Sequence, residues 1–341
     1  MTFSHDQYAA LQDGAGLFDR RSRGRLQLTG EDRRSYLHGL LTNDIAALVA
    51  GTGCYAALLT PQGRMISDMR VSELGSRLLI DLPGATADAV RQRLADFIFS
   101  EDVEVRDVAG EVGHCGLYGP EAADVLASVL GASDAIREQL SSMDSGSNSL
   151  CRFRASSLAV VRSDDYGAPG FEVFADAADI DPFTAAARAA GAQDVEAAAL
   201  EVTRIEAGRP EFGVDMDEHT IPLEAGIEDR AISLTKGCYV GQEVIIRVLH
   251  RGHGRVAKRL VGMIGASADG PLAGGTILEA EGKAIGSITS ATASPRLRRP
   301  IALGYVHRDF AEPGRVVHAA SRGSARSLTV VTTPFVPTTS E

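Results

Sequence analysis

The chain has 341 residues, which is longer than one ordinary domain and predicts about two or three of them. Its composition, 44% hydrophobic and 23% charged, is typical of soluble globular proteins. The formal net charge of -11 argues against a general nucleic-acid binder, because such proteins rely on cations that neutralise phosphate. No apolar run approaches the length needed to cross a bilayer, and the N-terminus lacks the pattern of a signal peptide. We therefore expect a cytoplasmic protein with no membrane partner.

The first half of the chain alternates short strands with helices. The predicted elements are a strand at 26–28, a helix that opens at 30–32 and runs to 41, strands at 54–59, 65–71 and 77–81, a helix at 90–98, a strand at 103–105 and a helix after Pro120. The two strands at 54–59 and 65–71 are joined by a Pro-Gln-Gly-Arg turn, which indicates a hairpin.

Strands follow at 151–162 and 170–174, and Ala-rich helices at 182–190 and 195–207. This interleaving predicts an α+β fold rather than a doubly wound parallel sheet. After about residue 250, glycines and β-branched residues dominate and indicate a small β-barrel. The expected domains are 1–250, with two subdomains, and 251–335.

Residues 236–243, Lys-Gly-Cys-Tyr-Val-Gly-Gln-Glu, combine a thiol, a cation, two glycines and a polar pair in one short segment. Cys238 is reactive as the thiolate, and a nearby Lys236 would lower its pKa by stabilising that charge. Gly237 and Gly241 allow positive φ or a close approach of the backbone. The alternative is a buried, inert cysteine in a turn.

Three carboxylates are further candidates. Glu206 lies in the last turn of the helix at 195–207, where the helix dipole disfavours a negative charge. The alternative to a functional role is that Arg204 or Arg209 neutralises the Glu206 carboxylate. Glu224 is framed by apolar residues and could accept a pair of donors, or be an exposed loop acid. Asp68 interrupts a strand and faces either a cavity or the solvent.

The segment 247–259 gathers arginines, among them Arg251 and Arg259, in an otherwise acidic chain. It could attract an anion, or be a solvated positive face. The four cysteines are far apart and form no zinc pattern, and His250 and His253 have no acidic or cysteine neighbour. We expect no metal site.

Together these motifs resemble a known family. The octet K-G-C-Y-x-G-Q-E is similar to the signature of YgfZ-type folate-binding proteins, which are relatives of the glycine-cleavage aminomethyltransferase, the T-protein. Further motifs that resemble this superfamily are G-L-F-D at 16–19, L-T-N-D at 41–44, L-T-P-Q-G-R at 59–64, R-I-E-A-G-R-P at 204–210, I-P-L-E-A-G at 221–226 and A-L-G-Y-V at 302–306.

The resemblance implies a ring of domains around a central tetrahydrofolate site, with a C-terminal β-barrel. It implies that Glu206 and Glu224 contact folate, and that Asp68 matches the segment of the catalytic aspartate, although Ser67 departs from the pattern. Arg251 and Arg259 would meet the glutamate tail of folate. Tyr239 and Gln242 would shape the loop of Cys238.

Two functions follow from the resemblance. The first is a tetrahydrofolate-binding accessory protein that supports assembly or repair of iron–sulfur enzymes, including tRNA-modifying ones. Its essential thiol would be Cys238, kept nucleophilic by Lys236. The second is an aminomethyltransferase that moves a one-carbon unit onto tetrahydrofolate with the help of Asp68. The octet favours the first, because the T-protein has no equivalent cysteine loop. A relative that has lost folate is a third possibility, against which Glu206 and Glu224 argue.

Overall fold

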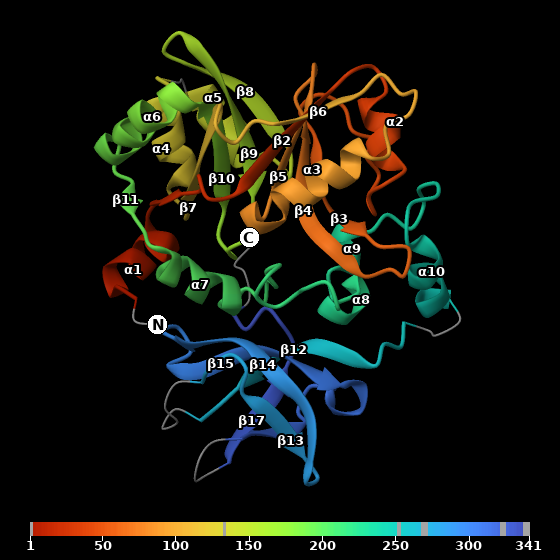
Figure 1. Cartoon of the computed structure of the whole chain (residues 1–341). Coiled ribbons are helices and arrows are strands. Elements are labelled where there is room, and N and C mark those ends of the chain that lie inside the picture. Colours follow the sequence, from red (N-terminus) through yellow and green to blue (C-terminus); the bar gives the residue numbers. More distant parts are fainter. Residues whose placement is uncertain (1–2, 132–133, 251–253, 267–271, 321–324, 337–341) are drawn as a thin grey trace.

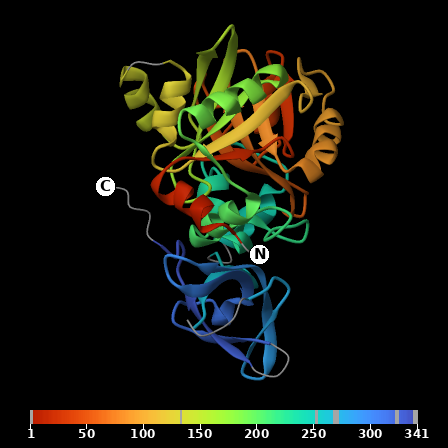
Figure 2. The same cartoon turned by 90° about the vertical axis from the view of Figure 1, so that its left-hand side faces the viewer.

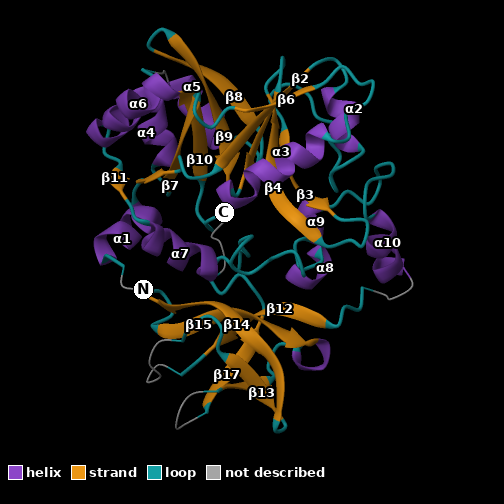
Figure 3. Cartoon of the chain, in the orientation of Figure 1, coloured by secondary structure: helices purple, strands orange, loops and turns teal. Residues whose placement is uncertain are grey.

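The structure is a computed structural model that describes residues 3–131, 134–250, 254–266, 272–320 and 325–336. Two β-sheets lie side by side above a C-terminal barrel, and most helices lie around their outer sides (Figure 1, Figure 3). Figure 2 shows that the barrel projects as a separate body below the two sheets.

The first sheet is antiparallel, with the order β3-β4-β5-β2-β6. Its elements are β2 (Gly24–Thr29), α2 (Arg33–His38), β3 (Gly53–Leu59), β4 (Met65–Glu73), β5 (Leu78–Leu82), η1 (Gly84–Thr86), α3 (Ala87–Ala95) and β6 (Glu104–Asp107). Alternating residues such as Leu26 and Leu28 are completely buried against Leu37 of α2 and against Val90 and Leu94 of α3. This burial fixes which face of each strand points to the helices.

The second sheet has the order β11-β1-β7-β10-β9-β8. Its elements are β1 (Gly16–Asp19), β7 (Val112–Tyr118), α4 (Ala122–Val129), α5 (Asp134–Ser141), β8 (Asn148–Phe153), β9 (Ser156–Ser163), β10 (Gly170–Asp176), α6 (Ala177–Ala189) and β11 (Gln193–Asp194). Leu117, Phe171 and Val173 of the strands pack with Leu126 of α4 and Phe183 of α6 in its core.

Helices α1 (His5–Asp13) and α7 (Ala197–Glu206) lie between the second sheet and the barrel. Three short helices follow: α8 (Pro222–Ala225), α9 (Glu228–Ala231) and α10 (Gln242–His250). The closed barrel is formed by β12 (Lys258–Ile264), β13 (Ile277–Ala280), β14 (Lys283–Ser294), β15 (Arg299–His307), η2 (Arg308–Phe310), β16 (Val316–Ala319) and β17 (Arg326–Val331).

The barrel is joined to α7 by a small apolar cluster. Ile205 of α7 packs with Ile301, Leu303 and Phe335, and the backbone N–H of Phe335 donates to the carbonyl of Glu206 at 2.9 Å. The end of the described chain is thus held against the end of α7.

The predicted α+β class and C-terminal barrel are confirmed. The helix α10 was not predicted, and the single strand expected at 151–162 is two strands, which turn at Arg154 with φ 55°. Within the described residues, no helix is both long and apolar enough to span a membrane.

Candidate functional site

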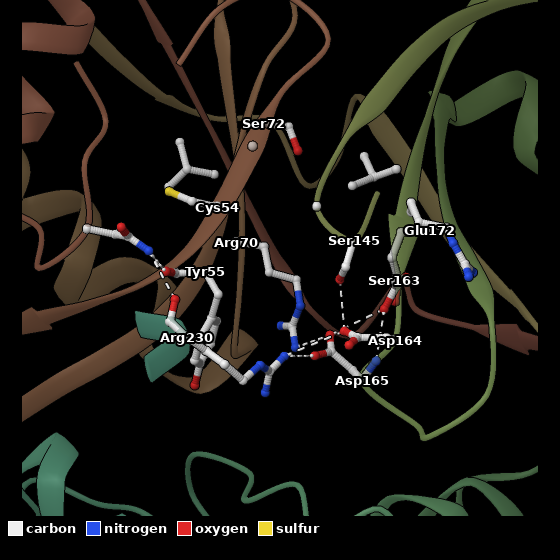
Figure 4. A pocket seen from close by; sticks show the side chains of 16 residues that line it. Cys54, Tyr55, Arg70, Ser72, Ser145, Ser163, Asp164, Asp165, Glu172 and Arg230 are labelled. Atoms are coloured by element: carbon white, nitrogen blue, oxygen red, sulfur yellow. Dashed lines mark hydrogen bonds and ion pairs between the residues drawn. The ribbon is translucent and has the colours of Figure 1, made fainter. Parts of the chain in front are cut away.

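A cavity of about 360 Å³ lies between the two sheets (Figure 4). Cys54 and Tyr55 of β3 and Arg70 of β4 form one wall, and the turn after β9, with Asp164 and Asp165, forms the opposite wall. Arg230 of α9 reaches the same space. The walls therefore come from segments that are far apart in the chain.

Asp165 is the centre of the polar contacts in this cavity. It forms an ion pair with Arg70 and another with Arg230 at 2.8 Å. Burial alone would raise the pKa of Asp165, but the two guanidinium groups outweigh it and hold that pKa well below its usual range. Both guanidinium groups also lie over the Tyr55 ring, at 5.5 and 5.1 Å from its centroid. The result is a rigid cluster that joins the first sheet, the second sheet and α9.

Asp68 lines a second, smaller space of about 40 Å³, the chamber, which shares Tyr55, Arg70, Asp165 and Arg230 with the main cavity. The Asp68 side chain is buried, and its Oδ2 accepts a hydrogen bond from the Tyr55 hydroxyl at 2.7 Å. Burial, followed by the nearby Asp68 charge, raises the pKa of Tyr55 well above its usual value, so the phenol remains a donor. Of the two orientations open for Asp68, the structure has the one that faces the interior.

Glu206 lies at a joint between three elements. It accepts hydrogen bonds from Tyr8 of α1 at 2.8 Å and from the Ser294 hydroxyl of β14. Burial raises its pKa, and the two hydrogen bonds oppose that shift. Both carboxylate oxygens have partners within the protein, so its folate contact stays a prediction.

The expected neutralisation of Glu206 by Arg204 or Arg209 is wrong. Arg204 forms an ion pair with Asp215 at 2.6 Å, and Arg209 one with Asp164 at 3.1 Å. Hydroxyl donors from elements distant in sequence take the place of the nearby arginines.

Glu224 lies at the junction of α8 and β12, away from the residues that line the main cavity and the chamber. It is half-buried, and its Oε2 lies 3.9 Å from Lys258 Nζ. Burial raises the pKa of Glu224, while Lys258 lowers it. Its role in folate binding is untested by this geometry.

The octet forms an anchored loop in which Cys238 is exposed. The Lys236 ammonium donates to the backbone carbonyls of His38, Leu41 (2.6 Å) and Asn43 (3.0 Å). The Tyr239 N–H donates to Gln242 Oε1 at 3.1 Å, which fastens the loop to the start of α10. Cys238 is therefore not buried, and its reactivity stays a prediction. Lys236, Tyr239 and Gln242 hold the backbone that presents the thiol.

The loop also rests on the first hairpin. Gly241 has φ +85°, and a Cβ atom there would lie 2.5 Å from the Thr60 carbonyl oxygen, so only glycine fits. Lys236 gives three hydrogen bonds to the backbone, which are as many as an ammonium can donate. Its activation of Cys238 therefore stays a prediction.

The basic segment lies elsewhere. Arg251 is outside the described residues. Arg259 is exposed, donates to the Gly254 carbonyl at 3.1 Å, and lines an open hollow with Arg255, Arg308 and Arg315 on the outside of the barrel. Among the predicted site residues that the structure describes, only Asp68 lines the cavity or the chamber.

Sequence reasoning missed Tyr55, Arg70, Asp165 and Arg230. One signal was available, because Arg70 follows Asp68 by two residues in a strand, and residues two apart share a face. Asp165 and Arg230 lie in loop and short-helix segments that give no periodic signal.

The fold and the cavity define a multi-domain α+β protein that encloses a cavity between two sheets, with a barrel attached. Residues 2–236 match the GCVT N-terminal domain, and residues 258–337 match the glycine cleavage T-protein C-terminal barrel domain. The chain therefore belongs to the glycine cleavage T-protein family.

Similar curated proteins are named aminomethyltransferase. That of Saccharopolyspora erythraea is 28% identical, and the match covers 96% of this chain and 89% of the relative. The aminomethyltransferase of Geobacillus kaustophilus is 29% identical, and the match covers 97% of this chain and 89% of the relative. The solved structure of aminomethyltransferase T from Bartonella henselae is similar over 98% of this chain and 89% of that chain, with a TM-score of 0.87 at 24% identity, which shows a common fold.

Proposed function

We propose that this protein binds tetrahydrofolate in the central cavity and transfers a one-carbon unit to it, as an aminomethyltransferase of the glycine cleavage type. The observation that carries the proposal is the buried Asp68, which lines the chamber and accepts a hydrogen bond from Tyr55, a residue that lines both the chamber and the cavity. A fixed carboxylate in a buried site can stabilise a cationic, iminium-like centre as it forms. The names of the similar proteins support the same reaction.

The size and lining of the cavity agree with such a ligand. About 360 Å³ lies within the usual range of roughly 300–1,000 Å³ for small-molecule pockets. The polar groups at Ser72, Ser163 and Asp164 can orient a pterin or an amide. Glu206 and Glu224, which the resemblance implied as folate contacts, do not line this cavity.

The test compares wild type with Asp68→Asn, which keeps the size of the side chain and removes its charge. We expect calorimetry to give tetrahydrofolate affinities within about 3-fold of one another. Aminomethyl turnover with a lipoyl carrier and ammonia should fall roughly 100-fold or more, the usual effect of losing a stabilising electrostatic group. Unchanged turnover in Asp68→Asn would contradict the role of Asp68. The control is the same substitution at the surface, Asp194→Asn, which should leave turnover unchanged.

A second candidate is favoured by one observation, the exposed thiol of Cys238 on an anchored loop. We propose as this alternative that the protein binds folate and supports assembly or repair of iron–sulfur enzymes, including tRNA-modifying ones, through that thiol. Cys238→Ser should then leave folate affinity intact. In cells whose only copy is the variant, the activity of these enzymes should fall.

The two candidates give opposite results. Turnover that survives in Cys238→Ser and is lost in Asp68→Asn supports the transferase. Folate binding without aminomethyl turnover in the wild type, together with a cellular defect of Cys238→Ser, supports the accessory role.

A further inference from the structure

The chamber beside Asp68 is rich in arginine. Of the described residues that line it, six are arginines and three are carboxylates. The arginines are Arg20, Arg23, Arg70, Arg204, Arg209 and Arg230. A bound water needs roughly 10–15 Å³ of such space, so 40 Å³ accommodates a group of about three heavy atoms.

Two of these arginines carry a buried N–H group that has neither a hydrogen-bond acceptor nor an ion-pair partner at that atom in the described structure: Arg23 Nη2 and Arg209 Nε. Arg20 Nε also makes no hydrogen bond, but a Glu172 carboxylate oxygen lies 3.4 Å from it. Arg20 itself is only 5% exposed. A buried donor left without an acceptor costs about 1–3 kcal/mol. Two such donors at one chamber indicate a ligand group with at least two acceptor atoms.

Carboxylates outside the chamber lining hold the three arginines in place. Glu172 lies 3.4 Å from Arg20 Nε, Asp81 lies 2.6 Å from Arg23 Nε, and Asp164 lies 3.1 Å from Arg209 Nη2. The unpaired N–H groups are thus fixed in orientation before any ligand arrives. Planar guanidinium donors of this kind match the two oxygens of a carboxylate.

We infer that the chamber is a carboxylate-binding subsite next to the main cavity. The inference rests on the proposed function, because the ligand in the main cavity and the group in the chamber would meet at Tyr55 and Asp68. The carboxylate belongs either to the glutamate part of folate itself or to a separate small carboxylate that enters with it.

Arg209→Gln is the variant of choice. Its partner Asp164 is 43% exposed at the side chain, so the change strands no buried charge. The partners of Arg20 and Arg23, Glu172 and Asp81, are almost fully buried, and substitution of those arginines would threaten the fold. Arg188→Gln, which removes a surface arginine paired with Asp194, is the matched control.

Calorimetry with tetrahydrofolate and with tetrahydropteroate, which lacks the glutamate, separates the two sources. If the glutamate occupies the chamber, Arg209→Gln weakens tetrahydrofolate binding about 10-fold or more and leaves tetrahydropteroate binding unchanged. If a separate carboxylate occupies it, both folates bind the variant normally. Sodium acetate then raises the unfolding temperature of wild type, but not of Arg209→Gln, relative to sodium chloride at equal ionic strength.

The inference is overturned if Arg209→Gln changes neither the folate preference nor the acetate effect, which would mean that the chamber holds water only. Equal weakening of both folates also overturns it. If the proposed function is wrong, neither tetrahydrofolate nor tetrahydropteroate binds the wild-type protein. The acetate experiment still tests the chamber in that case, because it does not depend on folate binding.

Discussion

The charged side chain of Lys236 hydrogen-bonds to backbone carbonyl groups. Its ammonium donates to the carbonyls of His38, Leu41 and Asn43, which end or follow α2. Burial lowers the pKa of Lys236 to about 8, and the contact therefore holds a charge that is costly to desolvate. The residue thus fastens the Cys238 loop to the first sheet.

Lys236→Met should lower the free energy of unfolding by about 1–3 kcal/mol, because charged hydrogen bonds to buried carbonyls are lost. Urea unfolding measures the change, and Lys283→Met at the exposed start of β14 is the control. An unchanged free energy of unfolding in Lys236→Met would contradict this role of Lys236.

Among the elements, the turn between β9 and β10 connects both sheets and α9. It projects Asp165 from the second sheet to Arg70 of the first sheet and to Arg230 of α9. Buried ion pairs of this kind fix relative position, since removal of one partner leaves the other charge uncompensated.

Asp165→Asn should cost about 3 kcal/mol of unfolding free energy at pH 7. The pKa of Asp165 is lowered in the folded state, so its contribution is present above the ordinary carboxyl pKa and is lost as the pH falls below it. Urea unfolding from pH 7 to pH 2.5 should show the gap between wild type and variant closing in acid. A constant gap would contradict this, and Asp164→Asn is the exposed neighbour for comparison.

The limits of sequence reasoning are clearest at this scale. The hairpin of β3 and β4 and the helix α7 could be predicted, because their apolar periodicity is local. The cavity could not, because Tyr55, Asp165 and Arg230 meet only through tertiary packing. The partners of Glu206 likewise lie 198 and 88 residues away, so its local arginine neighbours were misleading.

In the whole molecule, a buried polar joint connects the barrel to the rest. Asp215, fully buried at its side chain, accepts from Arg204 of α7 at 2.6 Å and from Ser290 of β14 at 2.7 Å. Thr289 donates to the same carboxylate at 2.5 Å. The position of the barrel is thus set by directional bonds as well as by the apolar cluster around Ile205.

Asp215→Asn should reduce the free energy of unfolding by about 3–5 kcal/mol, because the Arg204 charge would remain buried with a weakened partner. Asp194→Asn, in an exposed ion pair, should change it by about 1 kcal/mol or less. Urea unfolding followed by circular dichroism compares the two, and equal effects would mean that the joint contributes little.

Glu206 has a consequence for how the chain is made. Tyr8, near the start of the chain, and Phe335, near its end, both hydrogen-bond to this one residue, and Ser294 of the barrel is the third partner. During synthesis on a ribosome, α1 and α7 emerge long before these last partners. The joint can close only after Ser294 and Phe335 have left the ribosome, so a nascent chain halted before Ser294 would keep the Glu206 carboxylate without its barrel donor.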